Sequence, residues 1–340
     1  MRRAYDVYTL GHALVDRQYV VSPEWLARHG VQKGVMTLVG PDRQAELRQA
    51  LADQSPVAQA SGGSAANTAI GVANLGGAPF HSGCVGDDDL GTFYLGDLTA
   101  AGVACRDRAR LAGPTGQCLV FITPDADRTL NTFLGASASV GPDHVEAEAI
   151  AASRWVYLEG YLLSSADGLA ACLEAQRQAR AAGARVALTL SDPTMIAAFR
   201  PRFQAVVQAG VELVFGNLDE ARAFTGETAA EPALTGLGMA AGGDVCVTCG
   251  AAGALVREGG QTRQVEGFPA TAVDSTGAGD LFAGGVLFAL TQGHSLAAAA
   301  RLGCWAAAHI VAQYGPRLQQ SLRQGAARLL NDGWEPKEPG

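Results

Sequence analysis

The chain has no apolar run long enough to cross a membrane, and the basic residues near its start are not followed by an apolar signal core. It also has no cluster of lysine and arginine. Its formal net charge of -8 argues against a nucleic-acid surface and gives no support for binding to anionic lipid. From these absences we expect a cytoplasmic protein with neither a membrane nor a nucleic-acid partner.

Cysteine is scarce, and its distribution does not suggest disulfide bonds. The seven cysteines are an odd number scattered along 340 residues, which indicates a reducing compartment. Cys246 and Cys249 have the C-x-x-C spacing of redox and zinc sites. They lie in a strand-like run, residues 244–249, with no second cysteine pair or histidine cluster nearby, so we interpret them as structural.

What the sequence does contain is a regular alternation of strand-like and helical segments. Its 48% hydrophobic residues are enough for one large domain and a small one. The two patterns alternate in chain order over residues 5–10, 65–75, 80–85, 90–101, 154–158, 166–182, 185–190, 195–208, 212–215 and 219–224. This order predicts an α/β fold with a mostly parallel sheet and helices on both of its faces.

Two stretches break this alternation, residues 14–39 and 115–134. Both have the pattern of short strands without long partner helices. Residues 117–123 and 129–134 flank a polar turn, which predicts a hairpin. Taken alone, an ordinary surface hairpin is the simplest interpretation.

A glycine-rich segment, residues 274–280, leads straight into an apolar helical stretch. Three small residues before a helix, Gly277, Ala278 and Gly279, leave backbone N–H groups aimed outward, where the helix dipole favours an anion. Asp280 follows at the helix start. It is either a stabilising acid of the first turn or a base that accepts the proton of a substrate hydroxyl. Because the chain has no G-x-x-x-x-G-K-[ST] P-loop, we expect phosphates at this helix start.

A second glycine-rich segment, residues 61–77, carries Gly62 and Gly63 ahead of a helix of small residues that contains Asn67. Glycine there lets a ligand approach the backbone closely. In this order and spacing the two segments strongly resemble the paired signatures of the ribokinase (PfkB) family of carbohydrate and nucleoside kinases, over nearly the whole chain. The resemblance implies a ribokinase-like fold and an ATP-dependent phosphotransferase with an alcohol group as acceptor. Asp280 would be its base, and the small residues before Asp280 its anion hole.

In this family two β excursions form a small lid over the sugar. The resemblance therefore divides the chain into an α/β core, residues 1–13, 40–114 and 135–332, and a β-stranded lid, residues 14–39 and 115–134. Such a lid excludes water, which prevents hydrolysis of the nucleotide in place of transfer. Because lids in this family are either free or shared across a dimer, a monomer and a homodimer both remain open.

The resemblance also implies sites for the nucleotide and its cations. Asn217 and Glu220 match the Asn-x-x-Glu motif that positions Mg²⁺ and its waters around the phosphates, although such a pair taken alone is more often a helix cap. Asp274 matches a region that binds K⁺ in several members. The expected nucleotide contacts are Asn217, Thr248, Gly250, Gly253 and Thr276, with the adenine near residues 306–313.

Arg128, at the turn of the predicted hairpin, matches a position where nucleoside kinases of this family often carry a phosphate-contacting arginine. There its guanidinium would close over the γ-phosphate and stabilise the charge on its oxygens. A lone arginine at a turn is otherwise usually only solvated, and both interpretations stay open.

The implied substrate contacts are His12, Asp16, Gly62, Gly63, Asn67 and Phe133. Asp16 can accept hydrogen bonds from neighbouring hydroxyls of a furanose, as the family's aspartate does. Residues 23–39 and 128–136 resemble the adenosine-kinase-like branch. His12 departs from that branch, which usually has asparagine there, so either the purine preference or the sugar contacts differ. A buried structural histidine is the competing interpretation.

Three functions follow as hypotheses. The first is transfer of the γ-phosphoryl group of ATP to the primary hydroxyl of adenosine or another nucleoside. The near rival is a kinase of free ribose, fructose or ketodeoxygluconate, and stacking of Phe133 or Phe121 on a purine would separate the two. The third is a non-catalytic nucleotide- or sugar-binding module, which gains little from a carboxylate beside polyphosphate.

Overall fold

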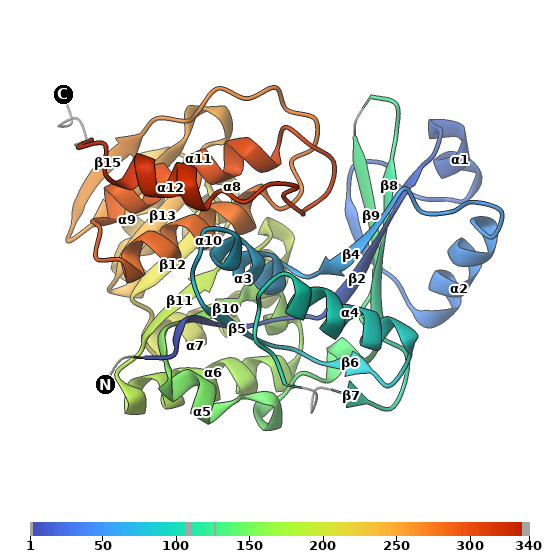
Figure 1. Ribbon diagram of the computed structural model, residues 1–340, viewed down its shortest axis with the longest axis horizontal. Coiled ribbons are helices and arrows are strands. Elements are labelled where there is room, and N and C mark those ends of the chain that lie inside the picture. Colours follow the sequence, from blue (N-terminus) through green and yellow to red (C-terminus); the bar gives the residue numbers. More distant parts are fainter. Residues whose placement is uncertain (1–2, 107–109, 126, 335–340) are drawn as a thin grey trace.

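The computed structural model describes residues 3–106, 110–125 and 127–334. Within them, an eight-stranded large sheet lies between two layers of helices (Figure 1). Its strand order is β15-β14-β13-β12-β11-β10-β1-β5, with parallel pairing from β13 to β5 and antiparallel pairing of β14 with both neighbours. The bounds are β1 Tyr5–Leu10, β5 Pro79–Ser82, β10 Ser153–Glu159, β11 Arg185–Thr189, β12 Leu213–Asn217, β13 Asp244–Thr248, β14 Ala254–Glu258 and β15 Gln261–Val265.

Side chains alternate along these strands, so both faces of the large sheet are buried. Tyr8 and Leu158 point to one face and Val7 and Tyr157 to the other. The first face packs under α5 Ala147–Ala151, α6 Ala166–Ala182, α7 Pro193–Gln208, α8 Leu218–Thr225 and α9 Ala230–Ala241. The second packs under α3 Ser64–Asn74, α10 Ala278–Thr291, α11 Leu296–Ile310 and α12 Arg323–Leu330. The α/β fold predicted from the alternating segments is confirmed.

A small sheet of five strands stands beside the large one (Figure 1). Its order is β3-β9-β8-β2-β4, with bounds β2 Leu14–Val20, β3 Met36–Leu38, β4 Ala58–Gly62, β8 Gly116–Ile122 and β9 Arg128–Phe133. Strands β8 and β9 form the antiparallel hairpin that the sequence predicts. On the side away from the core, Leu119 and Phe121 pack with α1 Pro23–Arg28 and α2 Pro41–Ala50.

Strand β4 belongs to the small sheet, although the family resemblance assigns its residues to the core range 40–114. It pairs antiparallel with β2 and leads into α3. Its sequence, Ala-Gln-Ala-Ser-Gly, has no β-branched or aromatic side chain, so no local signal for a strand exists. Pairing with β2, whose partner residues lie 40 to 48 positions earlier in the chain, creates the strand.

The apolar run 80–85, expected as one strand, is divided between β5 and β6 Val85–Gly86. The chain leaves the large sheet after β5, and β6 pairs instead with β7 Arg110–Leu111. The other elements of the described residues are α4 Asp89–Ala100 and the short 3₁₀ helices η2 Gly135–Ser139, η3 Pro142–His144, η4 Gly160–Ser164 and η5 Gly250–Ala252.

Cys246 is buried in β13 and Cys249 directly follows that strand, and both carry free thiols.

Across the described ranges, no helix is both long and apolar enough to cross a membrane.

Candidate active site

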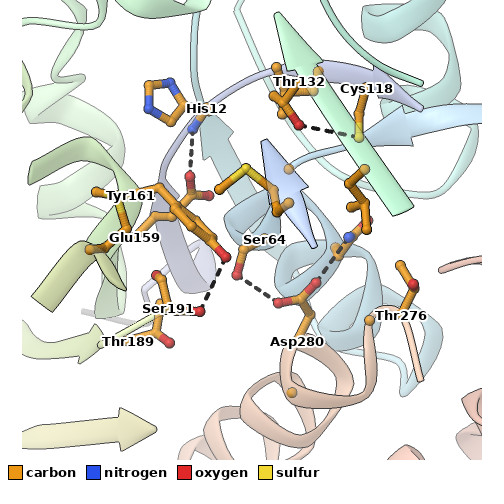
Figure 2. A pocket seen from close by; sticks show the side chains of 18 of the residues that line it. His12, Ser64, Cys118, Thr132, Glu159, Tyr161, Thr189, Ser191, Thr276 and Asp280 are labelled. Atoms are coloured by element: carbon orange, nitrogen blue, oxygen red, sulfur yellow. Dashed lines mark hydrogen bonds between the residues drawn. The ribbon is translucent and has the colours of Figure 1, made fainter. Parts of the chain in front are cut away.

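The glycine-rich loop before α10, residues 274–279, forms one wall of a cavity (Figure 2). Gly277 is the N-cap of α10 and has a left-handed backbone, φ 79°, which glycine adopts without strain. No side chain caps this helix, so its start stays open to an anion. Gly277 and Gly279 line the cavity, whereas Ala278 lies outside the lining and its N–H donates to the Ser275 carbonyl at 3.2 Å. The expected anion hole is therefore reduced by one N–H group.

Asp280, in the first turn of α10, reaches across to the start of α3. Its Oδ1 accepts a hydrogen bond from the Ser64 hydroxyl at 2.6 Å (Figure 2), and its Oδ2 accepts one from the Asn67 amide at 2.9 Å. Burial raises the pKa of Asp280, while these two hydrogen bonds and the charge of Arg317 oppose the rise. The contacts join the two glycine-rich segments at one carboxylate, which a merely stabilising first-turn acid does not require.

Both glycines before α3 are needed for close packing. A Cβ on Gly62 would overlap the carboxylate of Asp16, and a Cβ on Gly63 would overlap the backbone carbonyl of His12. Gly63 also has a positive φ of 98°, which other residues rarely adopt. These contacts bring Asp16 and His12 to the start of α3, whose Ser64 and Asn67 donate hydrogen bonds to Asp280. Burial raises the pKa of Asp16 to about 7, against the charges of Arg317 and Arg128.

The cavity has a volume of about 450 Å³ and lies between the two sheets. Its lining includes the predicted residues His12, Asp16, Gly63, Asn67, Asn217, Glu220, Thr248, Thr276, Gly277, Gly279 and Asp280. The small sheet and the segments next to it contribute mostly apolar side chains, namely Leu14, Met36, Leu38, Cys118, Leu130 and Leu134. The cavity is therefore polar beside α3 and α10 and apolar beneath the small sheet.

Phe133 and Phe121 do not face this cavity. Because side chains alternate along β9, Leu130 and Thr132 line the cavity, and Phe133 lines a neighbouring cavity next to η2 that shares Thr132 with the first. Phe121 is fully buried against Trp25, with ring centroids 5.0 Å apart. Neither ring lines this cavity in the structure, so contact of Phe133 with a substrate stays a prediction.

Arg128 lies at the start of β9 and contacts the glycine-rich loop. Its guanidinium forms an ion pair with Asp274 and donates to the Thr276 hydroxyl at 2.9 Å. Asp274 also accepts hydrogen bonds from the N–H groups of Thr276 at 2.9 Å and Gly315 at 2.6 Å. The Asp274 carboxylate is thus already paired with a cation, which disfavours K⁺ on this side chain. Arg128 is buried and not solvated, and it holds the small sheet against the loop.

Asn217 and Glu220 both cap α8 and line the cavity. The Asn217 Oδ1 accepts from the Glu220 N–H at 2.8 Å, and the Glu220 carboxylate accepts from the Asn217 N–H at 3.0 Å, which is a capping box. Burial raises the pKa of Glu220 to about 7. Amide and carboxylate oxygens at the cavity edge suit Mg²⁺, which keeps several waters, so the capping and metal interpretations are compatible.

The turn after β13 is only partly at the cavity. Thr248 lines it, whereas Gly250 and Gly253 lie farther along the turn, with positive φ values of 58° and 95°. A Cβ on Gly253 would overlap the Val265 carbonyl, so the turn itself requires glycine there. Nucleotide contacts at these glycines and near residues 306–313 remain predictions.

His12 lies across the cavity from Asp280 (Figure 2). Its ring is buried, and its Nδ1 lies 3.2 Å from the carbonyl and 3.1 Å from the hydroxyl oxygen of Ser137. Its Nε2 has no hydrogen-bond partner within the described residues. Because burial lowers the pKa of His12, the ring is neutral near pH 7.

Sequence reasoning missed Glu159, which ends β10 and lines the cavity. Its buried carboxylate accepts hydrogen bonds from the N–H groups of Ala65 at 2.8 Å and His12 at 3.2 Å (Figure 2 shows the second). Burial raises its pKa to about 8, against these two hydrogen bonds. An acid that directly follows the apolar strand 154–158 was the available signal, because the carboxyl ends of parallel strands meet at one edge of the sheet. Ser64, Tyr161 and Arg317 were missed as well.

We expect the free energy of unfolding to fall less between pH 5 and pH 8 in the Glu159→Gln variant than in the wild type. An acid with a raised folded-state pKa stabilises the fold fully below its unfolded pKa, and this contribution is lost as pH rises through the folded value of about 8. One such group changes the free energy of unfolding by up to about 1.4 kcal/mol per pH unit. Denaturant unfolding of both proteins at several pH values measures the difference, and an identical pH dependence would contradict the raised pKa.

Comparison with known proteins agrees with this arrangement. The model of the pfkB family of carbohydrate kinases matches residues 35–322. The chain belongs to this family. Adenosine kinase of Schizophyllum commune is 28% identical over 341 residues, which cover 93% of this chain and 97% of that protein. The pfkB chain is therefore a phosphotransferase that acts on an alcohol group, a nucleoside or sugar kinase.

Two solved structures extend the comparison. The crystal structure of adenosine kinase from Sinorhizobium meliloti is 38% identical with a TM-score of 0.88, and the match covers 96% of this chain and 99% of that one. A probable sugar kinase from Rhizobium etli CFN 42 is 36% identical with a TM-score of 0.89, with coverage of 96% and 98%. These relatives confirm the ribokinase-like fold and the adenosine-kinase-like branch of the pfkB family. Kinases of this family use ATP and Mg²⁺.

Proposed function

We propose that the protein transfers the γ-phosphoryl group of ATP to the primary hydroxyl of a ribose-containing nucleoside, with adenosine as the best acceptor. The observation that carries this proposal is the division of one cavity into two parts. Asp280 and the open start of α10 lie in its polar part, with Asp16 also in the wall, and apolar side chains of the small sheet line the rest. A nucleoside has the matching division into hydroxyl-bearing ribose and flat apolar base.

Asp280 acts as the general base in this proposal. Its carboxylate takes the proton from the acceptor hydroxyl while the hydroxyl oxygen bonds to the γ-phosphorus and the bond from that phosphorus to the bridging oxygen of ADP breaks. The N–H groups at Gly277 and Gly279 stabilise the charge on the transferring group. Mg²⁺, held through water by Asn217 and Glu220, would neutralise charge on the nucleotide phosphates.

His12 contacts the nucleobase in this proposal. Since a carbonyl oxygen only accepts, a neutral ring beside the Ser137 carbonyl carries its hydrogen on Nδ1, which leaves Nε2 as an acceptor. Nε2 is buried and has no hydrogen-bond partner among the described residues, so in this proposal the ring turns toward the cavity when the nucleobase binds. The exocyclic amine of adenine is a donor, whereas the oxygen of inosine or guanosine at that position is not. Apolar contact with Leu130, Leu134 and Met36 replaces aromatic stacking on the base.

A free-sugar kinase remains the second candidate because of Glu159. This carboxyl adds a further polar group to a cavity that already contains Asp16, and each can bind sugar hydroxyls. The relative from Rhizobium etli, described as a probable sugar kinase, is also consistent with it. The apolar lining beneath the small sheet favours the nucleoside, since a free pentose leaves that surface without a partner.

Initial rates of ADP release over a panel of acceptors test the proposal. The panel contains adenosine, inosine, guanosine, cytidine, ribose, fructose and ketodeoxygluconate, each with ATP and Mg²⁺. We expect the highest kcat/KM with adenosine. A higher kcat/KM with a free sugar would select the second candidate, and ADP release that no acceptor stimulates would reject both.

The preference for adenosine over inosine should depend on His12. In the His12→Asn variant an amide that both donates and accepts replaces a fixed acceptor, so we expect the ratio of kcat/KM between adenosine and inosine to fall about tenfold. The same ratio measured for Asn74→Ala, a residue outside the lining of the cavity, is the control. An unchanged ratio in His12→Asn would show that the ring contacts no part of the base.

A further inference from the structure

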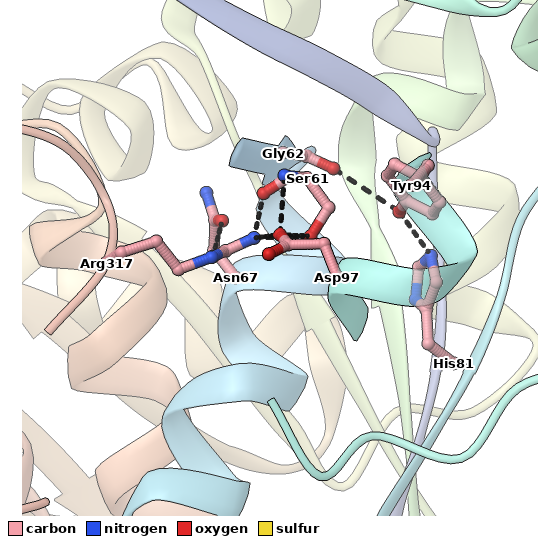
Figure 3. Close-up of polar contacts among 7 residues, drawn as sticks. All are labelled: Ser61, Gly62, Asn67, His81, Tyr94, Asp97 and Arg317. Atoms are coloured by element: carbon pink, nitrogen blue, oxygen red, sulfur yellow. Dashed lines mark hydrogen bonds and ion pairs between the residues drawn. The ribbon is translucent and has the colours of Figure 1, made fainter. Parts of the chain in front are cut away.

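Arg317, in the segment between α11 and α12, contacts three separate parts of the fold (Figure 3). Its Nη1 donates to the Asn67 Oδ1 at 3.0 Å, and its Nη2 donates to the hydroxyl oxygen of Ser61 at 2.6 Å and to the Ser61 carbonyl. The same nitrogen lies 3.5 Å from the Asp97 carboxylate of α4. None of these contacts is local, since Asn67 is 250 positions away along the chain.

The contact with Asn67 determines which way its amide points. Because the amide oxygen accepts from Arg317, the amide nitrogen is turned toward the Asp280 Oδ2, to which it donates at 2.9 Å. A rotated amide would instead place its oxygen against the Asp280 carboxylate, and two acceptors in contact repel each other. Arg317 therefore selects the amide orientation that holds the base.

The contact with Ser61 links the same arginine to the small sheet. Ser61 lies in β4, directly before Gly62, and Asp97 accepts from both its N–H at 2.8 Å and its hydroxyl at 2.6 Å (Figure 3). Gly62 in turn packs against the Asp16 carboxylate. Arg317 thus holds both the Ser61 backbone, next to the proposed sugar contact Asp16, and the Asn67 amide, which donates to Asp280.

We infer that Arg317 is a positioning residue for phosphoryl transfer, which orients Asn67 and through it the Asp280 carboxylate without touching the substrate itself. The inference rests on the proposed function, in which Asp280 is the base. Arg317 lies outside both glycine-rich segments, although its contacts align them.

The positive charge of Arg317 has a second effect, because it lowers the pKa of Asp280 and of Asp16 against the rise caused by burial. Other titratable groups at the cavity also interact electrostatically with Asp280. These are Asp16 on β2, Glu159 and Tyr157 on β10, Tyr161 on η4 and Glu220 on α8. The charge of Arg317 lowers the pKa of Asp280 against these acids, so its removal should make the Asp280 carboxyl harder to ionise.

The test compares Arg317→Gln, Arg317→Lys and Arg328→Gln, an exposed arginine on α12, in the full-length protein. We expect Arg317→Gln to lower kcat with the best acceptor about 100-fold, because small misplacements of a base have effects of that size. The acidic limb of its kcat–pH profile should move up by about one pH unit, since an activating base must be ionised and a nearby cation is lost. Arg328→Gln should match the wild type in both readouts.

Arg317→Lys separates orientation from charge. It keeps the cation but loses the planar fork, so we expect the acidic limb to stay at the wild-type pH while kcat recovers only in part. If Arg317→Gln does not fold, the test rests on Arg317→Lys. A kcat of Arg317→Lys equal to that of the wild type would then contradict the inference. A folded Arg317→Gln with unchanged kcat and acidic limb, but a lower unfolding temperature, would show a structural role only. Absence of turnover by the wild type with every acceptor would reject the proposed function and not this residue in particular.

Discussion

The Asp280→Asn variant is expected to lose about 10³-fold in kcat with adenosine, while the dissociation constants of adenosine and ATP change only a few-fold. Loss of a positioned general base typically has an effect of 10²–10⁴-fold. The substitution keeps the shape of the side chain and an oxygen that can accept from Ser64 at the same place. It removes the group that takes the hydroxyl proton, and it also removes the acceptor of the hydrogen bond from the Asn67 amide.

The fold should survive this substitution. Burial raises the pKa of Asp280, which means that the ionised carboxylate is disfavoured where it lies, so a neutral amide does not lower stability through lost charge. Thermal unfolding of the variant checks this point alongside the kinetics.

The matched control is Asp89→Asn, because Asp89 is an exposed acid in the first turn of α4 and lies outside the cavity. Both substitutions remove one first-turn acid and its charge interaction with the helix dipole. Equal losses of kcat in the two variants would mean that Asp280 only stabilises its helix. We expect the Asp89 variant to retain wild-type kcat.

The Asp16→Asn variant is expected to lose about 100-fold or more in kcat/KM for adenosine, chiefly through KM. The buried carboxylate can accept from two neighbouring ribose hydroxyls, and each hydrogen bond to a charged group contributes about 1.5–3 kcal/mol. An amide accepts with one oxygen only and places a donor where the second hydroxyl needs an acceptor.

Two controls separate sugar recognition from general damage. With 2′,3′-dideoxyadenosine, which lacks both hydroxyls, the wild type and Asp16→Asn should differ by less than about threefold, because neither can form the bonds. Asp42→Asn, an exposed acid on α2 beside the small sheet, should behave as the wild type with both substrates. An equal loss with adenosine and its dideoxy analogue would contradict hydroxyl binding by Asp16.

The raised pKa of Asp16 adds a dependence on pH to the same experiment. Because its pKa in the free protein is about 7 and the ionised form accepts two hydroxyls, kcat/KM for adenosine should rise between pH 6 and pH 8. This rise should be much smaller for the dideoxy analogue.

Much of the large sheet could be predicted from the sequence because its signals are local. The helix expected at 166–182 has those bounds in the structure, since Ser165 caps its start and Gly183, with a φ of 64°, ends it. The strands that are buried on both faces contain short apolar stretches, such as residues 155–158 of β10, which are recognised without knowledge of their partners.

Most residues around Asp280 could be predicted from the sequence, but the contacts between them could not. The two glycine-rich segments predict Asn67 and Asp280, yet nothing in either segment indicates that the Asn67 amide bridges to Arg317. The ion pair of Arg128 with Asp274 and the inclusion of β4 in the small sheet are also long-range pairings. The direction of Phe133 depends on the register of β9, which a shift of one residue reverses.

The central claim is that one site transfers the γ-phosphoryl group of ATP to the primary hydroxyl of a nucleoside with Asp280 as the base. A competition assay tests it most directly, with adenosine and ribose at equal concentration, ATP and Mg²⁺, and identification of the phosphorylated carbon by NMR. We predict adenosine 5′-monophosphate as the main product, formed in equal amount with ADP by the wild type and about 10³-fold more slowly by Asp280→Asn. Ribose phosphate as the main product, or an equal rate in the two proteins, would contradict the account.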